Sequence, residues 1–195
     1  MVDFSIKRLQ MDEESESRVY HLFDREGSLK IVADFASPWL SSEHSDRYVR
    51  FADSSGKTIA QMDLAATETK MLGGRQSQDY AIVLNHAVFA ILSEYQWHDE
   101  EGSRTYFVLR VAESMWLVLK EETNQPHFTI YNEVPASLTS RSMEPMFSDL
   151  PEPIGEINQD SQQYNYLVRW QEDSIKRLGI VVLGLIFLID RLKDV

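Results

Sequence analysis

The pattern of hydrophobic and polar positions is most distinctive near the end of the chain, where residues 178–189 form an unbroken apolar run of twelve. Lys176 and Arg177 precede this run and Asp190 follows it. At about 1.5 Å per residue, a helix over the run would be ~18 Å long, whereas a bilayer core is about 30 Å thick. The pattern therefore predicts a helix buried on every side within a protein rather than a membrane span.

A strand is the alternative interpretation of this run, because it contains several β-branched residues and two glycines, Gly179 and Gly184. Length favours the helix, since buried strands usually have about 4 to 8 residues, and Asp173 or Ser174 is a suitable N-cap just upstream. We predict a central helix over residues 174–192, in which the glycines let neighbouring groups approach closely. Its core residues would be Leu178, Ile180, Val181, Val182, Leu183, Leu185, Ile186, Phe187, Leu188 and Ile189.

Short apolar stretches separated by turn signals begin near residue 19, and one turn motif, Asp-x-x-Gly, recurs among them. Asp can bond the backbone two residues on and Gly can take a positive φ, so the motif is typical of a hairpin loop. Calcium binding is the functional alternative, but an EF-hand loop needs carboxylates at alternate positions over about twelve residues, and these segments lack them. We predict hairpin tips at Asp24 and Gly27, Asp53 and Gly56, and Asp99 and Gly102.

The stretches between the turns have the composition of strands. Some, such as residues 81–84 and 116–119, are almost wholly apolar, which indicates strands that pack against a core. Residues 87–92 could instead form a helical turn. The spacing is that of an all-β sandwich or barrel, with strands predicted over residues 48–52, 58–64, 80–84, 87–92, 106–111, 115–119, 128–131, 154–157 and 164–170.

Two segments lack this pattern. Residues 1–18 end in an acidic, polar run and predict a solvated N-terminal tail, followed by a single domain over residues 19–195. Residues 135–153 are rich in Ser, Pro and Met, and their prolines disfavour regular structure, so we predict the longest loop there. Its apolar side chains either form a binding site or fix the loop to the barrel, and we prefer the second interpretation: Met143, Met146 and Phe147.

Composition narrows the function classes. The chain has 195 residues, 43% of them hydrophobic, and no cysteine, which excludes disulfides, thiolate catalysis and cysteine-based metal sites. The polar N-terminal sequence lacks the apolar segment of a signal peptide, so we expect a reducing, cytoplasmic location. The net charge of −12 disfavours nucleic acid and anionic membranes as partners, unless basic residues gather on one face of the fold.

Candidate catalytic chemistry is sparse. His98 lies beside Asp99, Glu100 and Glu101, but at a predicted hairpin tip solvent would weaken any tuning of a pKa, so a solvated loop is the preferred interpretation. The chain has no nucleophile elbow, phosphate-binding loop or dinucleotide fingerprint. We therefore expect that the protein is not an enzyme and has no cofactor. We also expect no metal site, because metal-ligand spacing is absent among the histidines His21, His44, His86, His98 and His127.

The order of elements nevertheless resembles one family. Strand, Asp-x-x-Gly turn and strand recur, as in VRFADSSGKTIAQMDL over residues 49–64, and a late strand, YNYLVRW, leads through QED to the terminal run. This order resembles the tubby C-terminal-like superfamily, and most closely its scramblase and LURP-one-related branch. The resemblance covers residues 19–192, and Ile189 and Asp190 stand where the family's helix ends in Ile-Asp or Leu-Asp. It implies a mainly β fold, in which a closed antiparallel barrel of about twelve strands, without free edges, encloses a hydrophobic C-terminal helix.

The resemblance also implies a function, which is a non-enzymatic intracellular module that binds a lipid or a peripheral membrane surface. The chain departs from scramblases in having no cysteine and only Glu172 and Asp173 where their acidic calcium segment lies, and from tubby proteins in having no basic run. A protein-interaction or structural module with an acidic surface is the alternative. A second alternative is a tail anchor over residues 175–192, which Asp190 opposes because a carboxylate is too short to reach the headgroups. We expect a lipid or protein partner, no nucleic acid and no integral membrane span.

Overall fold

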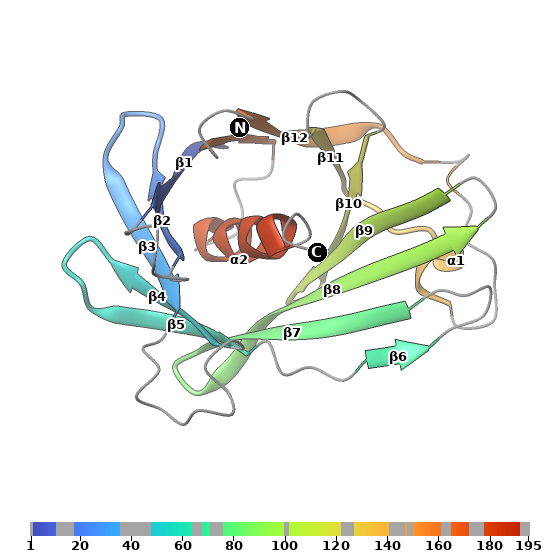
Figure 1. The fold of residues 1–195 in the computed structure, drawn as a ribbon, viewed down its shortest axis with the longest axis horizontal. Helices are drawn as coiled ribbons and strands as arrows, with labels where there is room; N and C mark the ends of the chain where they lie inside the picture. The colour runs from blue at the N-terminus through green and yellow to red at the C-terminus, as the bar shows by residue number, and fades with distance from the viewer. Residues whose placement is uncertain are drawn as a thin grey trace.

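The computed structural model describes residues 2–10, 18–35, 48–63, 68–70, 76–99, 102–121, 127–140, 147, 150–160, 165–171 and 178–191 (Figure 1). Two of the elements are helices, α1 (Ala136–Thr139) and α2 (Leu178–Arg191). The strands are β1 (Val2–Gln10), β2 (Arg18–Phe23), β3 (Leu29–Phe35), β4 (Tyr48–Asp53), β5 (Thr58–Asp63), β6 (Glu68–Lys70), β7 (Gln76–Leu84), β8 (Ala87–Asp99), β9 (Gly102–Val111), β10 (Ser114–Lys120), β11 (His127–Tyr131), β12 (Pro153–Asp160) and β13 (Asn165–Trp170).

The strands form one antiparallel sheet that closes on itself. Its order is β5-β4-β3-β2-β1-β13-β12-β11-β10-β9-β8-β7-β6, and the additional pairing of β5 with β7 closes a barrel of twelve strands. The short strand β6 pairs with β7 beyond the end of β5. The predicted fold class is therefore confirmed. Closure pairs strands that would otherwise lie at the two edges of the sheet.

Helix α2 lies inside this barrel (Figure 1). Its apolar side chains from Leu178 to Ile189 are all buried and form one core with the inward-facing side chains of the strands, among them Leu22 on β2, Met62 on β5 and Leu92 on β8. The prediction of a buried central helix is confirmed. Residues 174–177 and 192 of the predicted range lie outside the described residues.

The two glycines of α2 mark close contacts with the barrel. A Cβ atom on Gly179 would lie 3.1 Å from Cδ1 of Ile31, and one on Gly184 would lie 3.1 Å from Sδ of Met62. Both distances are shorter than an ordinary van der Waals contact, so these glycines let strand side chains reach the helix backbone, as the sequence predicted.

The predicted N-terminal tail is wrong for residues 2–10, which form strand β1. This strand pairs with β2 on one side and β13 on the other, and Ile6 is fully buried between them. Its alternation is that of a half-buried strand: Ile6 faces the helix while Lys7 is exposed. The alternation was not recognised in the sequence, because only one face of the strand packs on the core and polar residues occupy much of the rest. The acidic run that suggested a tail, residues 12–17, lies outside the described residues.

Two further details differ from the sequence interpretation. Residues 87–92 belong to strand β8 and not to a helical turn, and the loop after β11 contains the one-turn helix α1. The hydroxyl of Tyr106 donates a hydrogen bond to the carbonyl of Leu138 (2.6 Å), and the ring of Phe147 packs edge-on against Tyr106 with centroids 5.7 Å apart. These contacts agree with Phe147 fixing the loop to the outside of the barrel. Met143 and Met146 lie outside the described residues.

Candidate functional site

The predicted hairpin residues at Asp24 and Asp53 form hydrogen bonds within their own turns. Oδ1 of Asp24 accepts a hydrogen bond from the N–H of Ser28 (2.8 Å), and Gly27 has a φ of 77°. Asp53 and Gly56 repeat this arrangement, with a φ of 84° at the glycine. A carboxylate that accepts backbone N–H groups and a glycine in the left-handed region stabilise a tight turn. Strands β8 and β9 meet where the third tip is predicted, with Asp99 paired to Gly102, and residues 100–101 lie outside the described residues.

A buried charged cluster lies at the end of α2. The carboxylate of Asp190 is only 1% exposed, and the hydroxyls of Tyr20 (2.7 Å) and Tyr166 both donate hydrogen bonds to it. Nη1 of Arg8 lies 3.7 Å from Oδ2 of the same carboxylate, and Nε2 of Gln159 donates to the hydroxyl of Tyr166 (3.0 Å). These contacts compensate for the removal of the carboxylate from water.

The cluster holds the end of the helix through contacts to Asp190. Burial, and then the charge of Asp190, raise the pKa of Tyr166 far above its usual value, so the phenol keeps the proton that it donates. Sequence reasoning placed Asp190 at the end of the helix but did not identify its partners. The signal that could have prompted a search is the carboxylate itself, because an aspartate directly after a fully buried run requires buried donors.

Two hollows on the outer surface of the barrel are lined by described residues. We use the name β13 wall for the outward face of strands β11, β12, β13 and β1, which are neighbours in the sheet. Side chains alternate along β13: Tyr166 points inward to Asp190, whereas Leu167 is 40% exposed. The outward-facing side chains of β1 and β12 lie beside those of β13, and those of β11 lie beside β12.

The larger hollow, here called the Leu167 hollow, has a volume of about 530 Å³. One row of paired residues crosses it, from Asp160 on β12 through Asn165 on β13 to Lys7 on β1. Lys7 and Asp160 are exposed, and the ammonium of Lys7 lies 5.5 Å from the ring centre of Phe23. The hollow thus combines one cation, one anion, three amide side chains and the apolar surface of Leu167. Its lining residues are Ser5, Ile6, Lys7, Asn158, Gln159, Asp160, Asn165, Tyr166 and Leu167.

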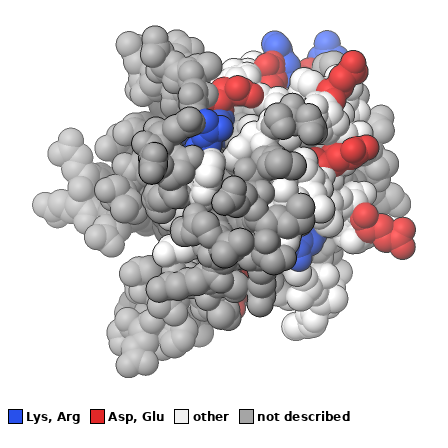
Figure 2. All heavy atoms as spheres, turned by 90° about the vertical axis from the view of Figure 1, so that its right-hand side faces the viewer, with Lys and Arg blue, Asp and Glu red and all other residues white. Residues whose placement is uncertain are grey.

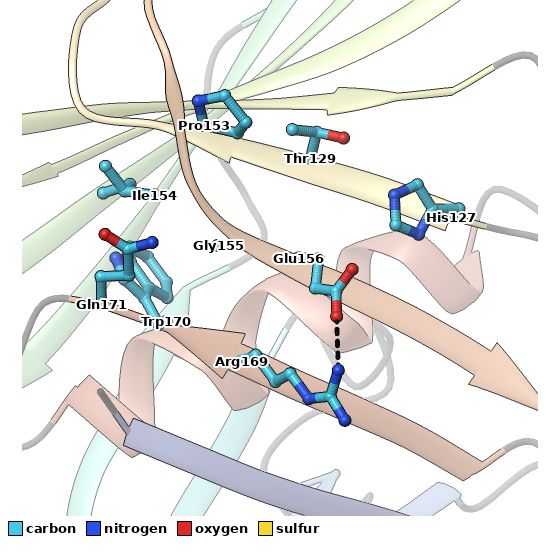
Figure 3. A pocket seen from close by; sticks show the side chains of 9 residues that line it. All are labelled: His127, Thr129, Pro153, Ile154, Gly155, Glu156, Arg169, Trp170 and Gln171. Atoms are coloured by element: carbon cyan, nitrogen blue, oxygen red, sulfur yellow. Dashed lines mark hydrogen bonds and ion pairs between the residues drawn. The ribbon is translucent and has the colours of Figure 1, made fainter.

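The smaller hollow, here called the Arg169 hollow, has a volume of about 290 Å³ and is shown in Figure 3. Nη1 of Arg169 lies 3.1 Å from Oε1 of Glu156, so these two charges neutralise each other across β12 and β13. The ring of His127 is hydrogen-bonded to Asn158, with Nδ1 2.7 Å from Oδ1. Because His127 lines the smaller hollow and Asn158 lines the larger one, this contact joins the two hollows into one surface.

The charges along the upper edge of the face drawn in Figure 2 are mixed. On the face drawn in Figure 2, basic and acidic side chains of the described residues lie side by side along the upper edge, and they form no continuous patch of one sign there. Within the described part of the chain, no three His, Asp or Glu side chains gather closely enough to hold a metal ion. Neither of the described helices has the length and apolar character needed to cross a bilayer.

Comparisons of the chain with protein-family models, with curated proteins and with solved structures gave no match. Among the described residues that the sequence singled out, those of the helix lie together in the barrel core. The hollows are formed by residues that the sequence analysis did not select.

Proposed function

We propose that the protein is a non-enzymatic binding module of the tubby C-terminal-like type, and that its β13 wall contacts a lipid or a peripheral membrane surface. The observation that carries this proposal is the filled interior. The side chains of α2 from Leu178 to Asp190 are buried against the strands, so the barrel encloses its own helix where a lipid-carrying barrel has a cavity. A ligand then binds on the outside, and both hollows described above lie on one outer wall.

The architecture supports the family part of the proposal. The resemblance implies a closed barrel of about twelve antiparallel strands around a C-terminal helix, and the barrel has twelve strands with α2 inside. The pair Ile189 and Asp190 lies buried near the C-terminal end of α2, and Tyr20 and Tyr166, on the strands at either side of β1, donate hydrogen bonds to Asp190. A fold does not fix a function, so the membrane contact needs its own test.

A protein-interaction module is the second candidate. The observation that favours it is the net charge of −12, since a strongly acidic protein is repelled by anionic membrane surfaces. The exposed apolar side chain of Leu167, within a polar surrounding, suits a protein partner as well as a lipid. Binding to vesicles therefore has to be measured over a range of headgroup charges.

Flotation with liposomes of varied headgroup composition tests the proposal. We expect the wild-type chain to float with at least one composition and Leu167→Asp to reduce the floating fraction, because the substitution places a charge at the centre of the β13 wall. Val88→Asp is the matched control, since Val88 on β8 is even more exposed, at 61%, and lies five strands away from β13 in the sheet. Failure to float with any composition would reject membrane binding, and equal losses in both variants would reject the β13 wall as the contact surface.

A further inference from the structure

We propose that the protein meets a phospholipid surface of no net charge, in which Leu9 and Leu167 insert below the lipid phosphates and Lys7 contacts those phosphates. This inference rests on the proposed function, and it names the residues and the headgroup charge of that membrane contact. We use the name Lys7 patch for the outward-facing side chains that carry it, on strands β1, β2 and β13: Lys7, Leu9, Val19, His21, Phe23 and Leu167.

Strand register brings these side chains together on one face. Side chains alternate along a strand, and buried residues such as Ile6 point into the barrel. The outward neighbours on β1 and β2 pair in rows: Ser5 with Phe23, Lys7 with His21, and Leu9 with Val19. Leu167 on β13 pairs with Ser5 from the other side. Lys7 is therefore flanked by Leu9 along its own strand and by Leu167 diagonally across to β13.

The two leucines of the patch are apolar groups left in water. Leu9 is 39% exposed and Leu167 is 40% exposed, and they lie on either side of Lys7. The described part of the chain has two other exposed large hydrophobic side chains, Val88 and Met115, which lie on β8 and β10. Exposed apolar side chains gain free energy when they enter the boundary between headgroups and acyl chains.

Lys7 differs from the cations on the nearby strands. Those on β1, β3, β4 and β13 with described side chains are paired with carboxylates: Arg8 with Asp190 (3.7 Å), Lys30 with Asp24 (2.8 Å), Arg50 with Asp34 (2.6 Å) and Arg169 with Glu156 (3.1 Å). Lys7 is exposed and forms no ion pair with a described carboxylate, and its ammonium lies 5.5 Å from the centre of the Phe23 ring. A lysine beside apolar side chains keeps its alkyl stem on them and extends its ammonium to the headgroups.

The charge of the whole chain decides which headgroups suit the patch. Lys7 is the one charge of the patch, because burial lowers the pKa of His21 below its usual value and leaves that ring neutral near pH 7. One lysine favours an anionic surface only about fivefold, whereas the chain as a whole carries a net charge of −12 and is repelled by it. Zwitterionic phospholipids also present phosphates, so they satisfy Lys7 without this repulsion.

Flotation with vesicles of phosphatidylcholine, with and without added phosphatidylserine, tests the headgroup charge. We expect the wild-type chain to float with phosphatidylcholine, and added phosphatidylserine to reduce the floating fraction at low salt. Physiological salt should restore part of this loss, since the Debye length shortens from about 30 Å at 0.01 M to about 8 Å at 0.15 M. Stronger binding to the phosphatidylserine vesicles at low salt would overturn the choice of an uncharged surface.

Two variants and a matched control test the patch on phosphatidylcholine vesicles. Leu9→Ser and Lys7→Gln should each weaken binding roughly fivefold. Lys120→Gln removes the same charge from an exposed position on β10, four strands from β1, and should leave binding unchanged. Unfolding temperatures equal to that of the wild-type chain show that the variants are folded. Equal losses in Lys7→Gln and Lys120→Gln would reject the phosphate contact, and wild-type affinity of Leu9→Ser would reject the insertion.

The absence of cysteine from the chain allows the insertion to be measured directly. Leu9→Cys and Val88→Cys each give a single site for an environment-sensitive fluorophore. We expect the emission at position 9 to shift to the blue when phosphatidylcholine vesicles are added, and the emission at position 88, which is exposed on β8, to stay unchanged. Equal shifts at both positions, or a shift at position 88 alone, would contradict the insertion of the Lys7 patch.

These experiments separate this inference from the proposed function. If vesicles bind but Lys7→Gln and Leu9→Ser bind as well as the wild-type chain, the membrane function stands and the Lys7 patch is rejected. If vesicles bind, both variants bind more weakly and only the label at position 9 responds, both stand. Absence of binding to every vesicle composition rejects the proposed function and this inference with it, and favours the protein-interaction candidate.

Discussion

Tyr166 donates a hydrogen bond to Asp190 inside the barrel, and this contact joins the end of the core helix to strand β13. Tyr20 on β2 donates a second bond to the same carboxylate, and Arg8 on β1 supplies the positive charge nearby. The strand order is β2-β1-β13, so three adjacent strands hold one residue of the helix. These strands include β1 and β13, which are the first and last of the described strands and pair with each other. The cluster therefore stabilises the pairing of β1 with β13.

Removal of either phenol hydroxyl should destabilise the fold. Tyr20→Phe and Tyr166→Phe each leave the buried carboxylate of Asp190 without one donor, which costs about 1–3 kcal/mol for a hydrogen bond to a charged group. Urea denaturation measures this loss as a change in the free energy of unfolding. Repeating both substitutions in an Asp190→Asn background gives double-mutant cycles, and a coupling energy near zero would contradict the cluster as described.

The fold should lose stability at alkaline pH through Tyr166. Its pKa is raised in the folded state, so the unfolded chain releases the phenol proton first, near pH 10, while the folded chain keeps it. The contribution of this group is fully present below about pH 10 and falls by up to ~1.4 kcal/mol per pH unit above it. Unfolding free energies at several pH values from 8 to 11 should show a shallower decline for Tyr166→Phe than for the wild-type chain. Identical slopes would contradict the prediction.

The elements predicted well from sequence are those with local signals. The length of the apolar run predicts the helix. The Asp and Gly of the Asp-x-x-Gly motif, which are close together in the chain, predict the hairpin tips at Asp24 and Asp53. Strand β1 was missed because polar residues stand between its apolar ones, and because its partner strand β13, beside which Ile6 is buried, is distant in the sequence. Strand β8 extends beyond the predicted stretch to Asp99 because it pairs with β7 and β9 there, and polar residues such as Glu94 interrupt its apolar pattern although Glu94 is buried.

The candidate site could not be predicted from local pattern at all. The hollow at Leu167 combines β1 with β12 and β13, and the sequence separates Lys7 from Asp160 by almost the whole chain. The register between first and last strands decides which side chains share a row. No propensity or motif encodes that register, since it follows from closure of the barrel around α2.

The close approach at Gly184 should make this position sensitive to size. A Cβ there would lie 3.1 Å from Sδ of Met62 and 3.3 Å from Cδ2 of Leu92, so Gly184→Val has to displace these two side chains within the packed core. We expect a loss of about 1–3 kcal/mol from overpacking. Gly184→Ala is the graded control, because the gain in helix propensity of about 1 kcal/mol offsets part of its smaller clash. Thermal unfolding should rank the wild-type chain above Gly184→Val, and a valine variant as stable as wild type would contradict this packing.

A single carboxylate in the middle of α2 tests the buried helix most directly. Leu185 is fully buried, so Leu185→Asp places an unpaired charge in the core and removes an apolar contact, at a cost of several kcal/mol out of a typical total of about 5–15. We expect an unfolded or aggregated chain by circular dichroism and size-exclusion chromatography. Leu167→Asp makes the same chemical change at an exposed position of the barrel and should leave the fold intact. A helix that acted only as a membrane anchor would tolerate Leu185→Asp, because the barrel would not depend on it. Cooperative unfolding of Leu185→Asp at the wild-type temperature would therefore overturn the buried helix and the filled interior on which the proposed function rests.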